Sequence, residues 1–217
     1  MSMTDATTLM NRIYRHQRFV YDPTRKCFLL GRDRLIDGLR PADGDKVLEI
    51  GCGTGRNLIR AARRYPGARL FGLDVSTEML TSAIDAIARA GLAARVRVTH
   101  ADAGGFDPKP LFGAVRFERI FISYSLSMMP HWPAVLEHAA TLLTPRGELH
   151  IVDFGQDEGL PHWFRALLRR WLALFEVTPR DRLEATLAAV AARLGATLTI
   201  ERPYRGYAQH AILRRAA

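Results

Sequence analysis

The sequence predicts an α/β fold in which helices cover both faces of a doubly wound, mostly parallel sheet. Short apolar runs alternate with helical patterns along the chain, which is the order that parallel sheets require. The last two apolar runs follow each other across the residues RPYRG, so we expect an antiparallel hairpin at one edge of the sheet. A glycine-rich turn separates the first predicted strand from the first predicted helix.

The first half of the chain gives three strands and two helices. Residues 46–51 form an apolar run typical of a buried strand, and a helix is predicted over 57–65. Residues 69–74 are predicted to form the second strand. The helix predicted over 76–91 places five apolar side chains on one face: Met79, Leu80, Ala83, Ile84 and Ile87. Residues 95–100 alternate in polarity like a third strand.

The middle of the chain continues this alternation. Residues 117–123 and 147–154 are predicted to form the fourth and fifth strands, with a helix over 132–143 between them. His150 lies inside the fifth predicted strand, and we interpret it as a core histidine whose hydrogen bonds are satisfied.

The last part of the chain gives two helices and the edge hairpin. Helices are predicted over 160–175 and 180–194, and Gly195 is expected to be the C-cap of the second. The hairpin strands are residues 196–202 and 207–214.

The domain organisation follows from length and pattern. The chain has 217 residues, of which 48% are hydrophobic, so one large domain can bury a sizeable core. Residues 1–40 are predicted to be helical and to form a lid segment outside this core, and residues 41–217 to form the main domain.

Charge and cysteine content restrict the partners. The formal net charge of +9 indicates an anionic partner, which is a nucleic acid, an anionic membrane surface or an acidic substrate. Cys27 and Cys52 are too few for a disulfide framework or a zinc site, so free thiols and no metal are expected. No secretory signal and no spanning apolar stretch is visible, and we expect a cytoplasmic protein.

The glycine-rich turn reads VLEIGCGTGRN and has glycines at positions 51, 53 and 55. Glycine lets the backbone turn sharply and approach a ligand closely. The spacing is G-x-G-x-G, which departs from the G-x-G-x-x-G of dinucleotide-binding proteins and makes a dehydrogenase less favoured. Asp74 ends the second predicted strand, where a carboxylate can accept both hydroxyls of a ribose, and Asp102 follows the third.

This set of residues resembles the class I S-adenosylmethionine-dependent methyltransferases. The family has an acidic residue before G-x-G-x-G, an acidic end to strand two and an aspartate after strand three, which match Glu49–Gly55, Asp74 and Asp102. The resemblance implies a Rossmann-like sheet with S-adenosyl-L-methionine as the cofactor. It implies that the methionine moiety lies on the glycine loop, the ribose on the strand-two aspartate and the adenine beyond it. The implied cofactor-binding residues are Glu49, Gly51, Cys52, Gly53, Asp74, Val75, Met79, Asp102 and Ala103.

A second resemblance concerns the methyl acceptor. Residues 14–35 (YRHQRFVYDPTRKCFLLGRDRL), together with FISYSLSMMP and VDFG, resemble the betaine-lipid N-methyltransferases. These enzymes trimethylate the amino group of diacylglyceryl homoserine. The alternatives are a phosphatidylethanolamine N-methyltransferase, a small-molecule or RNA methyltransferase, and a non-catalytic lipid-binding protein. The Asn/Asp-Pro-Pro-Tyr/Phe motif of nucleic-acid amino-methyltransferases is absent, so a nucleic-acid acceptor is not favoured.

The candidate acceptor-site residues are aromatic or basic. Aromatic faces stabilise the diffuse cations of methyl transfer by ~0.5–2 kcal/mol each. The candidate catalytic residues are Tyr14, Tyr21, Tyr124 and His131, with His131 as a proton acceptor. Arg25 and Arg32 are candidates for binding a substrate or cofactor carboxylate. The seven-residue spacing within each tyrosine and arginine pair also suits ordinary helix packing or a solvated face.

The helix predicted over 160–175 is amphipathic. Its apolar positions recur at helical spacing: Leu160, Trp163, Phe164, Leu167, Leu168, Trp171, Leu172 and Phe175. Arg165, Arg169 and Arg170 occupy other positions. Such a helix suits an anionic membrane surface, although a helix at this place in the fold also packs on the sheet. The expected location is therefore peripheral, at the inner surface of the cytoplasmic membrane.

Overall fold

The computed structural model describes residues 29–156, 158–174 and 179–217, and the structural statements below refer to these ranges. Tyr14, Tyr21 and Arg25 lie outside the described residues, as does most of the lid predicted over residues 1–40. For that segment the lid stays a prediction.

Seven strands form one sheet in the order β3-β2-β1-β4-β5-β7-β6. The strands are β1 (Lys46–Ile50), β2 (Arg69–Asp74), β3 (Val96–His100), β4 (Phe117–Ser123), β5 (Leu143–Phe154), β6 (Thr197–Glu201) and β7 (Ala208–Arg214). Strands β1 to β5 pair in parallel, whereas β7 runs antiparallel to both of its neighbours. This confirms the predicted Rossmann-like sheet with an antiparallel edge hairpin. The strand order reverses between β1 and β4, so loops at the carboxyl ends of these strands form the expected ligand site.

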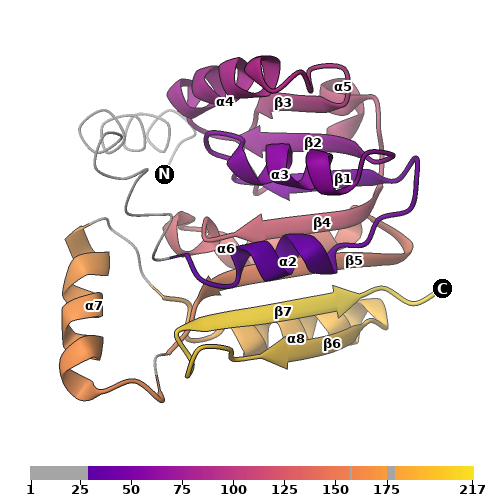
Figure 1. Cartoon of the computed structure of the whole chain (residues 1–217). Helices are drawn as coiled ribbons and strands as arrows, with labels where there is room; N and C mark the ends of the chain where they lie inside the picture. Colours follow the sequence, from indigo (N-terminus) through magenta and orange to yellow (C-terminus); the bar gives the residue numbers. More distant parts are fainter. Residues whose placement is uncertain (1–28, 157, 175–178) are drawn as a thin grey trace.

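Helices cover both faces of the sheet (Figure 1). They are α2 (Arg32–Gly38), α3 (Arg56–Arg64), α4 (Thr77–Arg89), α5 (Pro108–Phe112), α6 (Trp132–Thr141), α7 (His162–Leu174) and α8 (Leu183–Leu194), with a 3-10 turn, η1 (Leu126–Met128). One hydrophobic cluster joins α5, α6 and α8 to the sheet, and a second joins α2, α3 and α4 to the opposite face. The predicted helices are confirmed to within a few residues, and Gly195 caps α8 in the left-handed conformation.

Helix α2 belongs to the packed layer although its residues fall within the predicted lid. Leu35, Ile36 and Leu39 have no exposed surface and join the second hydrophobic cluster. The end of α2 is also bonded to its neighbours, because Arg119 Nε donates to the carbonyl oxygen of Leu39 at 2.6 Å. Residues 32–39 are therefore part of the core layer of the main domain.

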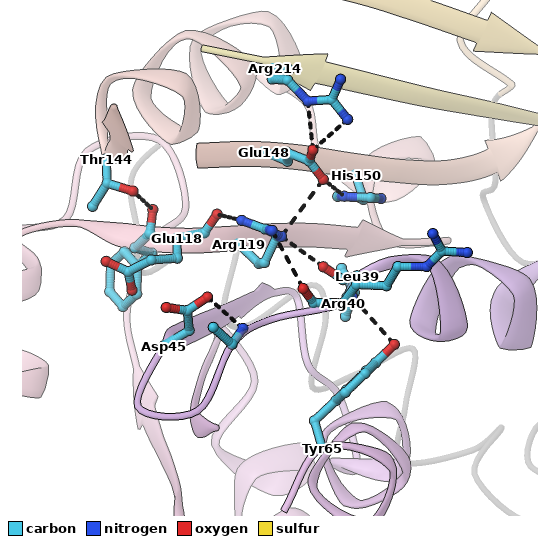
Figure 2. A network of polar contacts seen from close by, with 12 residues as sticks. Leu39, Arg40, Asp45, Tyr65, Glu118, Arg119, Thr144, Glu148, His150 and Arg214 are labelled. Atoms are coloured by element: carbon cyan, nitrogen blue, oxygen red, sulfur yellow. Dashed lines mark hydrogen bonds and ion pairs between the residues drawn. The ribbon is translucent and has the colours of Figure 1, made fainter. Parts of the chain in front are cut away.

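A charged network joins β4, β5 and β7 (Figure 2). Glu148 accepts from His150 Nε2 at 2.8 Å and from Arg214 Nε at 2.6 Å, and Arg119 Nε lies 3.6 Å from the same carboxylate. These partners, with the hydrogen bond from His150 contributing most, lower the pKa of Glu148 to about 2. His150 is 1% exposed, which confirms its core position. Its Nε2 is bonded to Glu148, whereas its Nδ1 has no hydrogen-bond partner among the described residues, so the ring is satisfied at one nitrogen only.

Candidate functional site

The glycine loop leads from β1 into α3 with three residues in the left-handed region. Gly51, Gly53 and Gly55 have φ values of +73°, +52° and +73°. The amides of Gly51 and Cys52 both donate to the carbonyl oxygen of Leu73, at 2.9 and 3.0 Å, which fixes the start of the loop on β2. The sequence adopts this turn because glycine has no Cβ to clash in this region of backbone space.

Asp74 holds the middle of the loop. One carboxylate oxygen accepts the amide of Gly53 at 2.8 Å, and the other accepts the amide of Ser76 at 2.9 Å. The carboxylate therefore stands beside the glycine loop, at the carboxyl end of β2. This is the position that the sequence predicts for a ribose-binding aspartate.

Open space lies over Gly53. A Cβ built there would meet no atom within 4 Å, whereas a Cβ at Gly51 would lie 2.6 Å from Ser125. The loop thus packs against the segment after β4 at Gly51, whereas the space over Gly53 is open. A ligand can approach the backbone closely at this point, so the residues present fit the methionine end of S-adenosylmethionine.

The residues predicted around the adenine lie at the adjoining ends of β2 and β3. Met79 and Ala103 are buried, while Asp102 is exposed and accepts the amide of Gly104 at 2.8 Å. His100 Nε2 lies 3.1 Å from the carbonyl oxygen of Val75 and links the two strand ends. An apolar surface flanked by the carboxylate of Asp102 suits a purine ring.

Glu49 and Cys52 lie beneath the loop. Glu49 is fully buried in β1 and accepts from Asn57 Nδ2 at 2.7 Å, so it fixes the first turn of α3. Burial, reinforced by the charges of Asp74 and Glu49, raises the pKa of the Cys52 thiol well above its usual value. The thiol therefore stays protonated.

Tyr124 has a different environment from that expected of a proton acceptor. It is 2% exposed, and its hydroxyl donates to the carbonyl oxygen of Leu30 at 2.5 Å. Its ring packs edge-on against Phe154 with centroids 4.7 Å apart. Burial raises the pKa of Tyr124 well above its usual value, and the opposing charge of Arg32 only partly offsets this. A neutral phenol bonded to the backbone is a poor base, so the geometry supports a positioning role at the chain entering α2.

The two remaining described acceptor-site candidates, Arg32 and His131, have different surroundings. His131 is exposed and its carbonyl oxygen accepts the amide of Ala134 in the first turn of α6, at the carboxyl end of the sheet. Arg32 is 8% exposed and lies near Tyr124, at the start of α2. The structure thus brings Arg32 and Tyr124 together and leaves His131 facing solvent.

Sequence reasoning missed three residues that form or contact the segment after β4. Ser125 donates its hydroxyl to the carbonyl oxygen of Ile50 at 3.0 Å. Asp153 is the penultimate residue of β5 and has no exposed surface, and burial raises its pKa to about 6. Arg180 donates to three carbonyl oxygens of η1 and the residue after it. The one sequence signal for these residues was Asp153 itself, an acidic residue near the end of an otherwise apolar run.

Alanine substitutions of two loop glycines are expected to separate backbone strain from side-chain clash. Both positions have positive φ, which costs about 1 kcal/mol for alanine. Gly51→Ala also drives a methyl group into Ser125, so we expect its unfolding temperature to fall several degrees below that of Gly53→Ala. Thermal unfolding followed by circular dichroism measures this difference. Equal unfolding temperatures would show that the segment after β4 does not rest on Gly51.

The sequence of this chain is similar to those of known methyltransferases. Residues 47–147 match the family described as "Methyltransferase domain". Nocamycin O-methyltransferase of Saccharothrix syringae is 33% identical over 164 residues, which are 75% of this chain and 56% of that protein. The ubiquinone/menaquinone biosynthesis C-methyltransferase UbiE of Paracoccus denitrificans is 30% identical over 122 residues, covering 56% of this chain and 47% of that protein. The chain spans about half the length of these curated relatives.

Solved structures share the fold. The apo form of the S-adenosylmethionine-dependent methyltransferase SibL superposes with a TM-score of 0.71 at 20% identity, covering 93% of this chain and 59% of that chain. Phosphoethanolamine N-methyltransferase 2 of Haemonchus contortus, in complex with S-adenosyl-L-methionine, has a TM-score of 0.61 at 22% identity. The match covers 79% of this chain and 38% of that chain. At these identities the likeness concerns the fold alone.

Proposed function

We propose that the protein is an S-adenosylmethionine-dependent methyltransferase that acts on an oxygen or carbon atom of a small organic molecule, because residues 47–147 match a methyltransferase domain. The oxygen and carbon acceptors are inferred from the two relatives described above, which are an O-methyltransferase and a C-methyltransferase. This differs from the lipid amine that the sequence resemblance favoured and agrees with one of its alternatives.

The observation that supports the proposal most is the glycine loop braced by Asp74 and open at Gly53. Asp74 would hold the ribose of the cofactor, and Met79 and Ala103 would flank its adenine. The bound cofactor supplies a methyl group on a positively charged sulfur. The chain itself binds and orients both reactants, which is the main requirement of an in-line displacement.

A hydroxyl acceptor has to lose its proton during the transfer. Tyr124 is bonded to the backbone as a neutral phenol, whereas His131 is exposed at the start of α6. A neutral imidazole has a ring nitrogen that can accept such a proton. His131 is therefore the described residue that we assign as proton acceptor for an O-methyl transfer.

A lipid amine is the second candidate acceptor, and helix α7 favours it. Trp163 and Leu167 are 71% and 60% exposed, while Leu168 and Leu172 pack into the core. Figure 1 shows α7 standing at the side of the sheet. A helix anchored by one face and exposing tryptophan, leucine and arginine suits contact with an anionic bilayer. Within the described ranges, no helix has the length and apolar character needed to cross a membrane.

The function is tested by incubating the protein with methyl-labelled S-adenosylmethionine and separate acceptor sets. The sets are phenols and enols, quinols, diacylglyceryl homoserine and phosphatidylethanolamine. Labelled O- or C-methyl products in the first two sets support the proposal, and the methyl chemical shift in NMR identifies the acceptor atom. Mono-, di- and trimethylated homoserine lipid, with the first two sets untouched, would replace it by the betaine-lipid activity.

Reversing the charge of α7 is expected to weaken membrane binding. Each arginine near an anionic surface contributes about 1 kcal/mol, so Arg165→Glu, Arg169→Glu and Arg170→Glu together should reduce binding at least a hundredfold. Co-sedimentation with phosphatidylglycerol vesicles measures this effect. The control is a second triple variant, Arg63→Glu, Arg69→Glu and Arg89→Glu. These three arginines are exposed on other elements, so the net charge changes by the same amount. If both triple variants lost vesicle binding equally, net charge alone would explain the effect and α7 would have no specific role in membrane binding.

A further inference from the structure

Two charged side chains form hydrogen bonds with the backbone of η1 and the residue after it. Asp153 Oδ2 accepts the amide of Ser127 at 3.0 Å. Arg180 Nη2 donates to the carbonyl oxygens of Ser127 at 2.9 Å and Met129 at 3.0 Å, and its Nε donates to that of Leu126 at 3.2 Å. Hydrogen bonds to ionised groups are about twice as strong as neutral ones. The turn is therefore fixed at one amide and three carbonyl groups.

Both of these side chains are themselves held in place. Asp153 has no exposed surface, and its Oδ1 accepts the amide of Phe154 at 2.8 Å. The guanidinium of Arg180 lies 5.9 Å from the ring centroid of Trp132. Gln209 Nε2 donates to the carbonyl oxygens of Phe154 at 2.8 Å and Arg180 at 3.4 Å. The charged pair thus has fixed positions between β5, β7 and α6.

The turn that they hold forms the wall of the glycine loop. A Cβ on Gly51 would lie 2.6 Å from Ser125 and 3.1 Å from the Cε of Met129, on either side of η1. Ser125 is also hydrogen-bonded to Ile50 at the end of β1. Because the two segments are in contact, a displacement of η1 is transmitted to the side of the loop where the acceptor would approach.

We propose that Arg180 and Asp153 are positioning residues, which fix the turn Leu126–Met128 against the glycine loop so that the acceptor meets the methyl group in one geometry. This inference rests on the proposed function and adds residues to the same site. Neither side chain is placed in contact with the cofactor. A misplacement of about 1 Å can cost about a hundredfold in rate. The glycine loop keeps its own bonds to Leu73 and Asp74, so cofactor affinity should change little.

The test compares Arg180→Met and Arg180→Lys with Arg182→Met, a control at an exposed neighbouring position. We expect Arg180→Met to lower kcat ten- to a hundredfold, while the Kd of S-adenosylhomocysteine changes less than about threefold. Lysine keeps the charge but not the planar fork of donors, so Arg180→Lys should recover part of kcat. Arg182→Met should keep the wild-type kcat.

A second readout needs no acceptor. Amide hydrogen exchange of residues 124–129, followed by mass spectrometry, should accelerate at least tenfold in Arg180→Met and stay unchanged in Arg182→Met. If Arg180→Met proves too unstable, Arg180→Lys and Asp153→Asn take its place, with the same expected direction in both readouts. Wild-type kcat and exchange in the Arg180 and Asp153 variants would overturn the positioning role. A wild-type protein that binds no S-adenosylhomocysteine would instead overturn the proposed function, whatever the exchange shows.

Discussion

Asp74→Asn is expected to weaken the binding of S-adenosylhomocysteine about a hundredfold. Hydrogen bonds to a carboxylate contribute about 1.5–3 kcal/mol each, and asparagine keeps only one acceptor oxygen. The substitution removes the charge that would hold a ribose hydroxyl. It also weakens the contact of 2.8 Å that braces Gly53. A loss of about 3 kcal/mol corresponds to the expected factor of a hundred in Kd.

Isothermal titration with S-adenosylhomocysteine measures this loss directly. Asp107→Asn is the matched control, because Asp107 is exposed and accepts the amide of Lys109 at 2.9 Å in a similar local bond, away from the loop. It should leave Kd within about twofold of the wild type, since N-cap bonds affect stability by about 1 kcal/mol and not this site. If both variants bind equally well, Asp74 is not a cofactor ligand.

The proximity of Asp74 to the glycine loop was predictable from sequence. Residues 69–74 and 117–123 are apolar runs bounded by polar residues, and both strands have the bounds that were predicted. Once a parallel sheet is inferred, the carboxyl ends of its neighbouring strands must meet at one edge. The loop and the aspartate therefore had to lie together.

Boundaries that depend on distant contacts were not predictable in this way. Strand β5 begins at Leu143 and not near Gly147, because the ladder to β4 resumes after a register shift. Arg146, with φ +61°, donates its amide to the carbonyl oxygen of Ala216 at 3.1 Å. Nothing in the local pattern indicates that the C-terminal end pairs with this turn.

The same limit applies to the residues of the site that sequence reasoning missed. Arg180 and Asp153 act on backbone groups of η1, and backbone groups leave no motif in a sequence. Tyr124 was chosen from its position after β4, but its positive φ and its bond to Leu30 were not predictable from the sequence. Its catalytic role stays a prediction. The surroundings of Tyr124, Arg180 and Asp153 depend on how β4 packs against β5 and α2, which a local sequence pattern does not indicate.

Glu148→Gln is expected to lower the free energy of unfolding at neutral pH by about 2 kcal/mol. The carboxylate joins His150, Arg119 and Arg214 across three strands (Figure 2). Glutamine leaves these donors without a charged acceptor. The full pKa shift of Glu148 corresponds to about 3 kcal/mol, and the exposure of Arg214 reduces this through solvent screening. In a chain of this size, the unfolding temperature should fall by about 5 °C.

The pH dependence separates this electrostatic effect from a packing defect. The pKa of Glu148 is about 2 in the folded protein and near 4.5 when unfolded, so folding favours the ionised form. Its contribution to stability is complete above about pH 4.5 and is lost as the pH falls toward 2. The difference between wild type and Glu148→Gln, measured by urea unfolding, should therefore shrink between about pH 6 and pH 3. The control Glu184→Gln breaks an exposed ion pair with Arg202 and should cost less than about 0.5 kcal/mol. A difference that stays constant over this range would assign the loss to packing and not to the charge of Glu148.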